Sequence, residues 1–148
     1  MKVVIDTNVV VSSFLSPGGA PARILKLLEQ EAFELVISEE ILQEYAVALQ
    51  YDRVQKLHKL TDQQIIRVIE DLRAAATFVK PTVSLTVVAS DPDDNKLFAC
   101  AVAGSAQFIV SGDTKVQAVK HYQGVVVLSP TLFLTMLEQL VPDGLSNR

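Results

Sequence analysis

Four acidic residues recur along the chain where an apolar segment ends or a predicted helix begins. Asp6 and Asp113 each follow a short apolar run, Asp94 stands at the start of a helical stretch, and Glu44 lies about two turns inside another. Carboxylate oxygens are hard ligands that suit Mg²⁺ or Mn²⁺, which take few carboxylates and keep several waters. These residue types predict metal-dependent chemistry on a phosphodiester, in which an ion polarises the phosphate and activates a water.

Other catalytic arrangements fit the sequence less well. His58 and His121 are far apart and Cys100 is the single cysteine, so the spacing typical of a zinc site is missing. Nothing marks either histidine as the base of a nucleophilic triad, and the pattern Gly-x-Gly-x-x-Gly is absent. Each acid also has an ordinary alternative, because Asp6 and Asp113 are suited to capping helices and Glu44 to facing solvent.

The elements that must position these acids alternate between strands and helices. This alternation predicts an α/β fold with a mostly parallel sheet covered by helices on both faces. The carboxyl ends of such strands bind ligands, so we expect Asp6, Asp94 and Asp113 at one edge of the sheet. We predict strands at residues 3–5, 33–37, 85–89, 107–110 and 125–128, with a short edge piece at 78–79. We predict helices at residues 20–31, 39–49, 62–76, 91–103, 114–122 and 130–140, and a helix or turn after Asp6.

The composition limits the class of protein. The chain has 148 residues, of which 49% are hydrophobic, and this predicts one folded domain. The apolar runs are too short for a membrane span, and the first residues predict a strand, so we expect no signal peptide. A single cysteine favours a reducing cytoplasm. The net charge of −4 is mildly unfavourable for binding nucleic acid by charge alone, but the four acids account for all of it.

The segments around the four acids resemble those of a known family. The stretch Val3-Val4-Ile5-Asp6-Thr7-Asn8 resembles the opening of PIN (PilT N-terminal) domains, and Glu44 matches their second acidic position. Residues 91–103 resemble the third block of the family, and residues 108–113 resemble the fourth. The resemblance runs from residue 2 to about residue 137. Each block alone is weakly specific, whereas four blocks in the family's order are strongly specific.

The likeness is strongest to the toxin-component branch of PIN proteins, related to the VapC-type toxins of prokaryotes. It implies a three-layer α/β/α sandwich of flavodoxin-like topology over residues 1–141, followed by a flexible tail at 142–148. It also implies a ribonuclease that uses one or two Mg²⁺ or Mn²⁺ ions and cuts RNA as the toxin of a type II toxin–antitoxin pair. A homodimer and a small antitoxin partner are further implications of the resemblance.

The resemblance also implies roles for particular residues. Carried over by position, the catalytic and metal-binding acids are Asp6, Glu44, Asp94 and Asp113. In the third block Asp94 is preferred to Asp93, because small residues follow it at the family's spacing, and Asp93 is suited to capping the helix. Four further residues are expected to lie next to these acids and to hold an acid or a water in position: Thr7, Asn8, Asp91 and Ser111. Residues 50–60 depart from the family pattern, so they give no guide to substrate or partner.

Three other functions compete with the nuclease. A catalytically silent PIN-fold module that binds RNA or a partner is disfavoured, because all four acids are present. Phospho-receiver domains resemble a pattern with paired acids after the first strand and a lysine after the last, and Leu128-Ser129-Pro130 offers no lysine. Haloacid-dehalogenase phosphatases resemble Asp-x-Asp, whereas this chain has Asp6-Thr7-Asn8.

Overall fold

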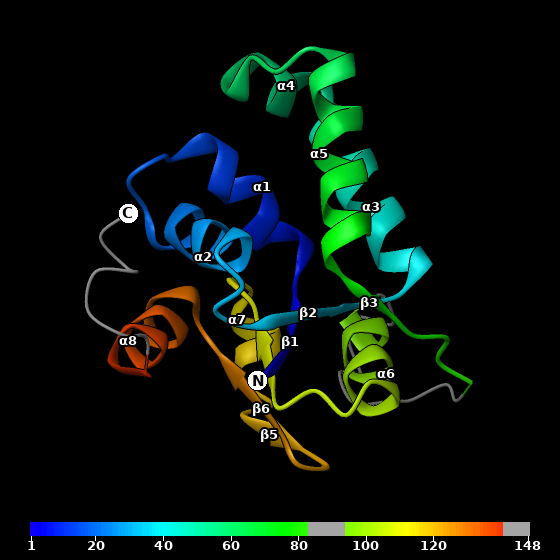
Figure 1. Ribbon diagram of the computed structural model, residues 1–148, viewed down its shortest axis with the longest axis vertical. Helices are drawn as coiled ribbons and strands as arrows, with labels where there is room; N and C mark the ends of the chain where they lie inside the picture. The colour runs from blue at the N-terminus through cyan, green and yellow to red at the C-terminus, as the bar shows by residue number, and fades with distance from the viewer. Residues whose placement is uncertain (83–93, 141–148) are drawn as a thin grey trace.

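Within residues 1–82 and 94–140, which the computed structural model describes, six strands form one sheet in the order β3-β2-β1-β4-β6-β5 (Figure 1). Neighbouring strands are parallel except β5 and β6, which are antiparallel. The strands are β1 (Lys2–Ile5), β2 (Glu34–Ile37), β3 (Thr77–Phe78), β4 (Phe108–Val110), β5 (His121–Tyr122) and β6 (Val125–Leu128). The helices are α1 (Thr7–Leu15), α2 (Ala20–Glu29), α3 (Glu39–Gln50), α4 (Asp52–His58), α5 (Asp62–Ala75), α6 (Asn95–Ala103), α7 (Thr114–Gln117) and α8 (Pro130–Leu140).

The first strand lies in the middle of the sheet, between β2 and β4. Its residues Val3, Val4 and Ile5 are at most 1% exposed, so both of its faces are buried. A strand buried on both faces needs apolar side chains at every position, which explains the continuous run that precedes Asp6. The position of β1 therefore places Asp6 at the centre of the carboxyl edge of the sheet.

Helices cover the sheet in layers. Helix α6 contacts β1, β2, β4 and β6, and Figure 1 shows it on the opposite side of the sheet from α2 and α8, which pack together. On the α8 side the Phe133 ring lies 5.3 Å from the Phe33 ring and 6.1 Å from the Phe108 ring, between centroids. These layers confirm the predicted α/β fold with a mostly parallel sheet.

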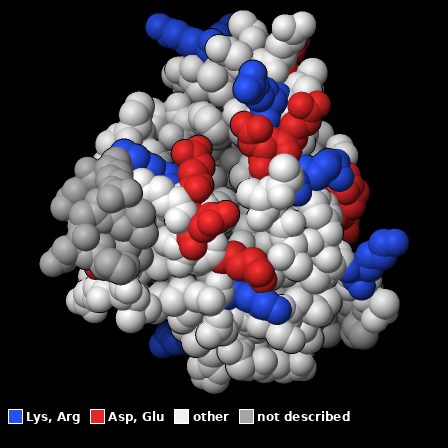
Figure 2. All heavy atoms as spheres, in the orientation of Figure 1, with Lys and Arg blue, Asp and Glu red and all other residues white. Residues whose placement is uncertain are grey.

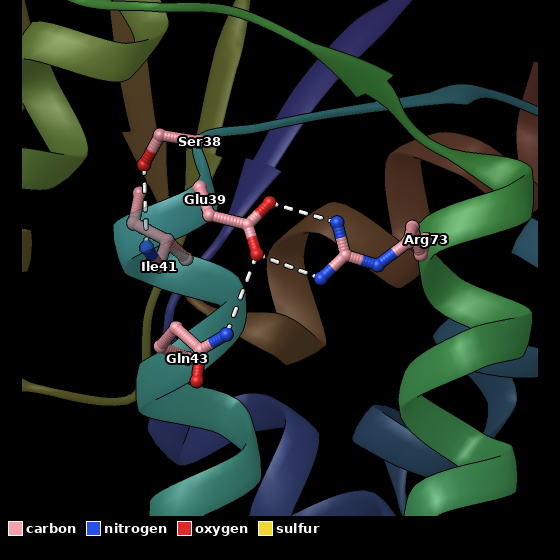
Figure 3. Close-up of polar contacts among 5 residues, drawn as sticks. All are labelled: Ser38, Glu39, Ile41, Gln43 and Arg73. Atoms are coloured by element: carbon pink, nitrogen blue, oxygen red, sulfur yellow. Dashed lines mark hydrogen bonds and ion pairs between the residues drawn. The ribbon is translucent and has the colours of Figure 1, made fainter.

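Helices α3 and α5 pack side by side, and α4 with the adjoining ends of both helices projects at the top of the view in Figure 1. Helix α3 begins where the Ser38 hydroxyl accepts a hydrogen bond from the Ile41 amide, 3.2 Å away. The Arg73 guanidinium of α5 donates two hydrogen bonds, of 2.7 and 2.8 Å, to the Glu39 carboxylate (Figure 3). This bidentate pair joins the start of α3 to the end of α5.

One segment differs from its sequence-based prediction. The helix predicted over residues 114–122 is wrong beyond residue 117, because His121 and Tyr122 form β5. A tight turn with positive φ at Gln123 and Gly124 joins β5 to β6. The polar segment at residues 50–60, for which no helix or strand was predicted, contains helix α4. The strand predicted at 85–89, the candidate site residue Asp91 and the predicted tail at 142–148 lie outside the described residues.

The surface carries charges of both signs. Figure 2 shows Asp and Glu side chains gathered near the middle of one face, while Lys and Arg side chains are scattered around it. Scattered single cations attract a polyanion more weakly than a continuous basic surface does. No helix within the described residues combines the length and apolar character that a membrane span requires.

Candidate active site

The Asp6 carboxylate sits directly after β1, where it is only 8% exposed. Its Oδ2 atom accepts hydrogen bonds from the Ser111 hydroxyl at 2.7 Å and from the Asn8 side-chain amide at 2.9 Å. Asp6 occupies the N-cap position of α1, but its side chain makes no capping hydrogen bond. The carboxylate is therefore held by one side chain from the first turn of α1 and one from the residue that follows β4.

A short network joins the end of β1 to the loop after β4. The Asn8 side-chain oxygen accepts a hydrogen bond from the Gly112 amide at 2.8 Å, while its NH₂ group donates to Asp6. The fully buried Ser111 hydroxyl accepts from the Asp113 amide at 3.0 Å and donates to Asp6. Asn8 and Ser111 therefore fix the Asp6 carboxylate relative to β4. The sequence had indicated both residues as neighbours of the acids.

Burial dominates the electrostatics of Asp6. Loss of hydration raises the pKa of this carboxyl above its usual value, and the negative charge of Asp113 raises it further. The hydrogen bonds from Ser111 and Asn8 favour the charged form and oppose this rise. A buried carboxylate next to another negative charge is stabilised by any cation that binds beside it.

Asp6 opens into a pocket of about 470 Å³. Three of the four predicted acids line it, because α3 contributes Glu44 and the residue preceding α6 contributes Asp94. Glu40 adds a fourth carboxylate from the first turn of α3. The complete lining consists of Asp6, Thr7, Glu40, Gln43, Glu44, Val47, Ala48, Tyr51, Asp94 and Leu97.

Tyr45 fixes α3 against the sheet beside this pocket. The residue is fully buried, and its hydroxyl donates a hydrogen bond to the carbonyl oxygen of Ile5, immediately before Asp6. Burial raises the pKa of Tyr45 well above its usual value, and the charge of Asp6 adds to this effect, so the hydroxyl keeps its proton. With Tyr45 facing inward, Glu44 lies at the border of the buried face and reaches the pocket.

A lysine from α6 crosses to these acids. The Lys96 ammonium lies 2.9 Å from Oε1 of Glu44 and 3.6 Å from Oε1 of Glu40. The Lys96 side chain is 22% exposed, which makes this contact more shielded from water than an ordinary surface ion pair. Two of the acids that line the pocket are thus paired with a cation of the chain itself.

Asp113 stands apart from the other three predicted acids. Its carboxylate accepts a hydrogen bond from the Lys115 amide at 2.8 Å and caps the short helix α7. It does not line the pocket, although its charge acts on Asp6. The structure therefore gathers Asp6, Glu44 and Asp94 in one pocket and places Asp113 beside them, beyond Ser111.

The chemistry of this lining fits a hydrated divalent ion. Within residues 1–82 and 94–140, no three His, Cys, Asp or Glu side chains cluster closely enough to enclose an ion by themselves. Mg²⁺ needs only one or two carboxylates, however, because it retains several waters. The Thr7 hydroxyl oxygen is buried at this pocket without a hydrogen-bond partner among the described residues, so it is available to a bound group.

Sequence reasoning did not assign Glu40 or Lys96 to this site. Glu40 lies in the first turn of α3, where the helix dipole favours a negative charge whether or not a site is nearby. Glu40, Glu44, Val47 and Tyr51 follow one another at helical spacing, and all line the pocket, so this stripe was a usable signal. Lys96 gave no such signal, because its partners lie on a helix more than fifty positions earlier.

Comparison with known proteins supports the same interpretation. A family model described as "PIN domain" matches residues 2–115. A relative from Methanocaldococcus jannaschii, named "Uncharacterized protein MJ1680", is 30% identical over 113 residues, which cover 76% of this chain and 71% of the relative. The chain therefore belongs to the PIN domain family, whose members are generally nucleases.

Proposed function

We propose that this chain is a metal-dependent endoribonuclease that hydrolyses RNA phosphodiester bonds. The observation that carries the proposal is the pocket at the carboxyl edge of the sheet, where Asp6, Glu44 and Asp94 converge from three separate elements. Family membership supports a nuclease, and the hard oxygen donors support Mg²⁺ or Mn²⁺. The choice of RNA rests on the resemblance to ribonuclease toxins.

Each residue of the site has a proposed task. Asp6 and Asp94 hold one or two ions, and Asp113 adds negative charge from beside them. Glu44 binds the ion or orients the attacking water. Ser111 and Asn8 keep the Asp6 carboxylate in position through their hydrogen bonds. Bound ions supply a polarised phosphate and a water of lowered pKa, which is the chemistry that these carboxylates lack by themselves.

The wall of the pocket beyond the acids suits a single-stranded substrate. Val47 and Tyr51 continue the lining along α3, and Tyr51 is 56% exposed. Exposed aromatic rings stack on bases without regard to sequence, which suits a nuclease that contacts unpaired nucleotides. We place the scissile phosphate at Asp6 and a neighbouring base at Tyr51.

The biological role is also a proposal. The resemblance to VapC-type proteins supports a toxin that acts as a homodimer and is silenced by a small antitoxin. Expression of the chain alone, with and without the Asp6→Asn substitution, tests this role through growth arrest. Arrest by the unsubstituted chain only is the expected result, and normal growth with abundant folded protein contradicts the toxin role.

Cleavage of structured and single-stranded RNAs tests the enzymatic function. We expect cutting in Mg²⁺ or Mn²⁺, none in EDTA, and loss of about 100-fold or more in Asp6→Asn and Asp94→Asn. The matched control is Asp71→Asn, because Asp71 is an exposed residue of α5 outside this pocket. Undiminished cutting by both site variants contradicts the assigned site.

A catalytically silent module is the alternative function. It predicts that the folded, unsubstituted protein binds RNA or a protein partner and cuts neither RNA nor DNA in any metal. Cutting of DNA alone by the same acids would keep the nuclease and change the substrate. These outcomes distinguish a ribonuclease, a nuclease that cuts DNA and a silent binding module.

A further inference from the structure

Lys96 of α6 forms ion pairs with two glutamates of α3 that belong to the candidate site. Its ammonium group is 2.9 Å from Glu44 and 3.6 Å from Glu40, which belong to consecutive turns of α3. Both glutamates line the pocket with Asp6 and Asp94. The ion pair therefore links α6 to two glutamates of α3 that line the candidate site.

The pocket concentrates negative charge that must be compensated. Four carboxylates line it, and burial of Asp6 weakens the compensation that water provides. A partly shielded ammonium at hydrogen-bond distance from Glu44 supplies one positive charge to this cluster. An ion that binds to Glu44 must compete with that ammonium for the same oxygen and must also tolerate a like charge nearby.

We propose that Lys96 is the built-in counter-cation of the acidic pocket, and that a divalent ion displaces it from Glu44. Lys96 then sets the ion concentration at which the pocket fills, and it stabilises the chain before an ion arrives. This inference rests on the proposed function, since it needs a divalent ion in the pocket. In this inference Lys96 acts through Glu44, because its ion pair controls whether Glu44 is free to bind the ion.

Direct binding of Mn²⁺ tests the inference without measuring cleavage. The signal of free Mn²⁺ in electron paramagnetic resonance gives the bound fraction for the unsubstituted protein and for Lys96→Gln, Lys96→Met and Lys96→Arg. We expect Lys96→Gln and Lys96→Met to bind Mn²⁺ about tenfold more tightly, because one positive charge has been removed at close range. Lys96→Arg keeps the charge and should bind as the unsubstituted protein does.

Thermal unfolding gives a second measurement on the same variants. In EDTA, Lys96→Gln should melt at a lower temperature than the unsubstituted protein, because the acids lose their counter-charge. In saturating Mn²⁺ it should gain more degrees than the unsubstituted protein gains. Lys26→Met is the matched control, because Lys26 is exposed on α2 and does not line this pocket, and it should leave both measurements unchanged.

The possible results separate this inference from the proposed function. Equal Mn²⁺ affinity in the unsubstituted protein and Lys96→Gln, or weaker affinity in Lys96→Gln, overturns the role of Lys96 and leaves the metal site intact. Binding of Mn²⁺ by Lys96→Gln alone supports the role of Lys96 strongly. If no variant binds Mn²⁺, both the metal site and the inference are wrong.

Discussion

The Tyr45 hydroxyl donates a hydrogen bond to the carbonyl oxygen of Ile5, which ties helix α3 to the last residue of β1. Glu44 precedes Tyr45 and Asp6 follows Ile5, so one buried contact fixes the separation of two candidate site residues. Neither partner touches the pocket itself. The geometry of the site therefore depends on a tyrosine that contributes no ligand.

Removing that hydroxyl should weaken the fold and loosen the site. Tyr45→Phe leaves the ring in place but deletes the donor to a buried carbonyl, so we expect a loss of about 1–3 kcal/mol in the free energy of unfolding. Urea denaturation followed by circular dichroism measures this change. Tyr122→Phe is the matched control, because the Tyr122 hydroxyl donates no hydrogen bond to a buried carbonyl within the described residues and accepts one from the exposed Gln123 side chain. Equal stability of the two variants contradicts the role of Tyr45.

Neutralising Asp6 should stabilise the protein when no ion is present. The pKa of Asp6 is raised by burial and by Asp113, so its negative charge at neutral pH opposes folding. Asp6→Asn removes that charge and keeps the side-chain shape, and we expect Tm in EDTA to rise by a few degrees while cleavage is lost. A lower Tm in EDTA would show that the charge of Asp6 favours the fold, contrary to this account.

The ion pair between Glu39 and Arg73 should make stability depend on pH in the acidic range. The hydrogen bonds from Arg73 hold the pKa of Glu39 below its ordinary value of 4.5. A carboxyl with a depressed pKa stabilises the folded state above its unfolded pKa, and the effect disappears as the pH falls through the folded pKa. The gap in stability between the unsubstituted protein and Glu39→Gln should be constant from about pH 7 to about pH 5 and should close below it.

Salt provides the check on that prediction. Both side chains of the pair are about half exposed, so mobile ions reach them. The screening length falls to about 3 Å in 1 M salt, and the gap at pH 7 should shrink in 1 M NaCl. A gap that persists at low pH and at high salt would mean that Glu39 acts through packing rather than charge.

Close packing around Gly104 should make this residue intolerant of a side chain. An alanine Cβ would lie 2.4 Å from Cγ1 of Val36, a fully buried residue of β2. We expect Gly104→Ala to lower the free energy of unfolding by about 1–3 kcal/mol through overpacking. Gly18→Ala, where no atom lies within 4 Å of the new Cβ, should change it by less than about 0.5 kcal/mol.

A double substitution distinguishes overpacking from other causes. If the clash with Val36 is responsible, adding Val36→Ala to Gly104→Ala makes the double variant less destabilised than the sum of the two single variants. The expected coupling exceeds about 0.5 kcal/mol, which is the usual limit for independent sites. Simple additivity would assign the loss to another feature of the turn after α6.

The sequence predicted the elements that carry strong local signals. The helix predicted at residues 62–76 begins at a capping box, in which Thr61 and Gln64 form both of the hydrogen bonds that define it. The apolar run before Asp6 predicted a strand, and β1 is that strand. In both cases the information is contained in neighbouring residues, so local reasoning was sufficient.

The sequence was less informative where distant contacts decide the structure. Strand β5 has two residues, too few to show the alternation that marks a strand, and it exists because β6 pairs with it. Lys96 reaches the site through an ion pair with Glu44, 52 positions away. The separation of Asp113 from the pocket depends on the path of the loop after β4, which spacing along the chain does not determine.

The bond between Ser111 and Asp6 has a consequence for the chain during its own synthesis. The two residues are 105 positions apart, and β1 gains its neighbour β4 only when residues 108–110 are available. Asp6 leaves the ribosome 105 residues before Ser111 does. A partly synthesised chain therefore contains the Asp6 carboxylate before it contains β4 and the Ser111 hydroxyl that hold this carboxylate in place. The candidate site is therefore incomplete until Ser111 and β4 have been synthesised and have joined β1.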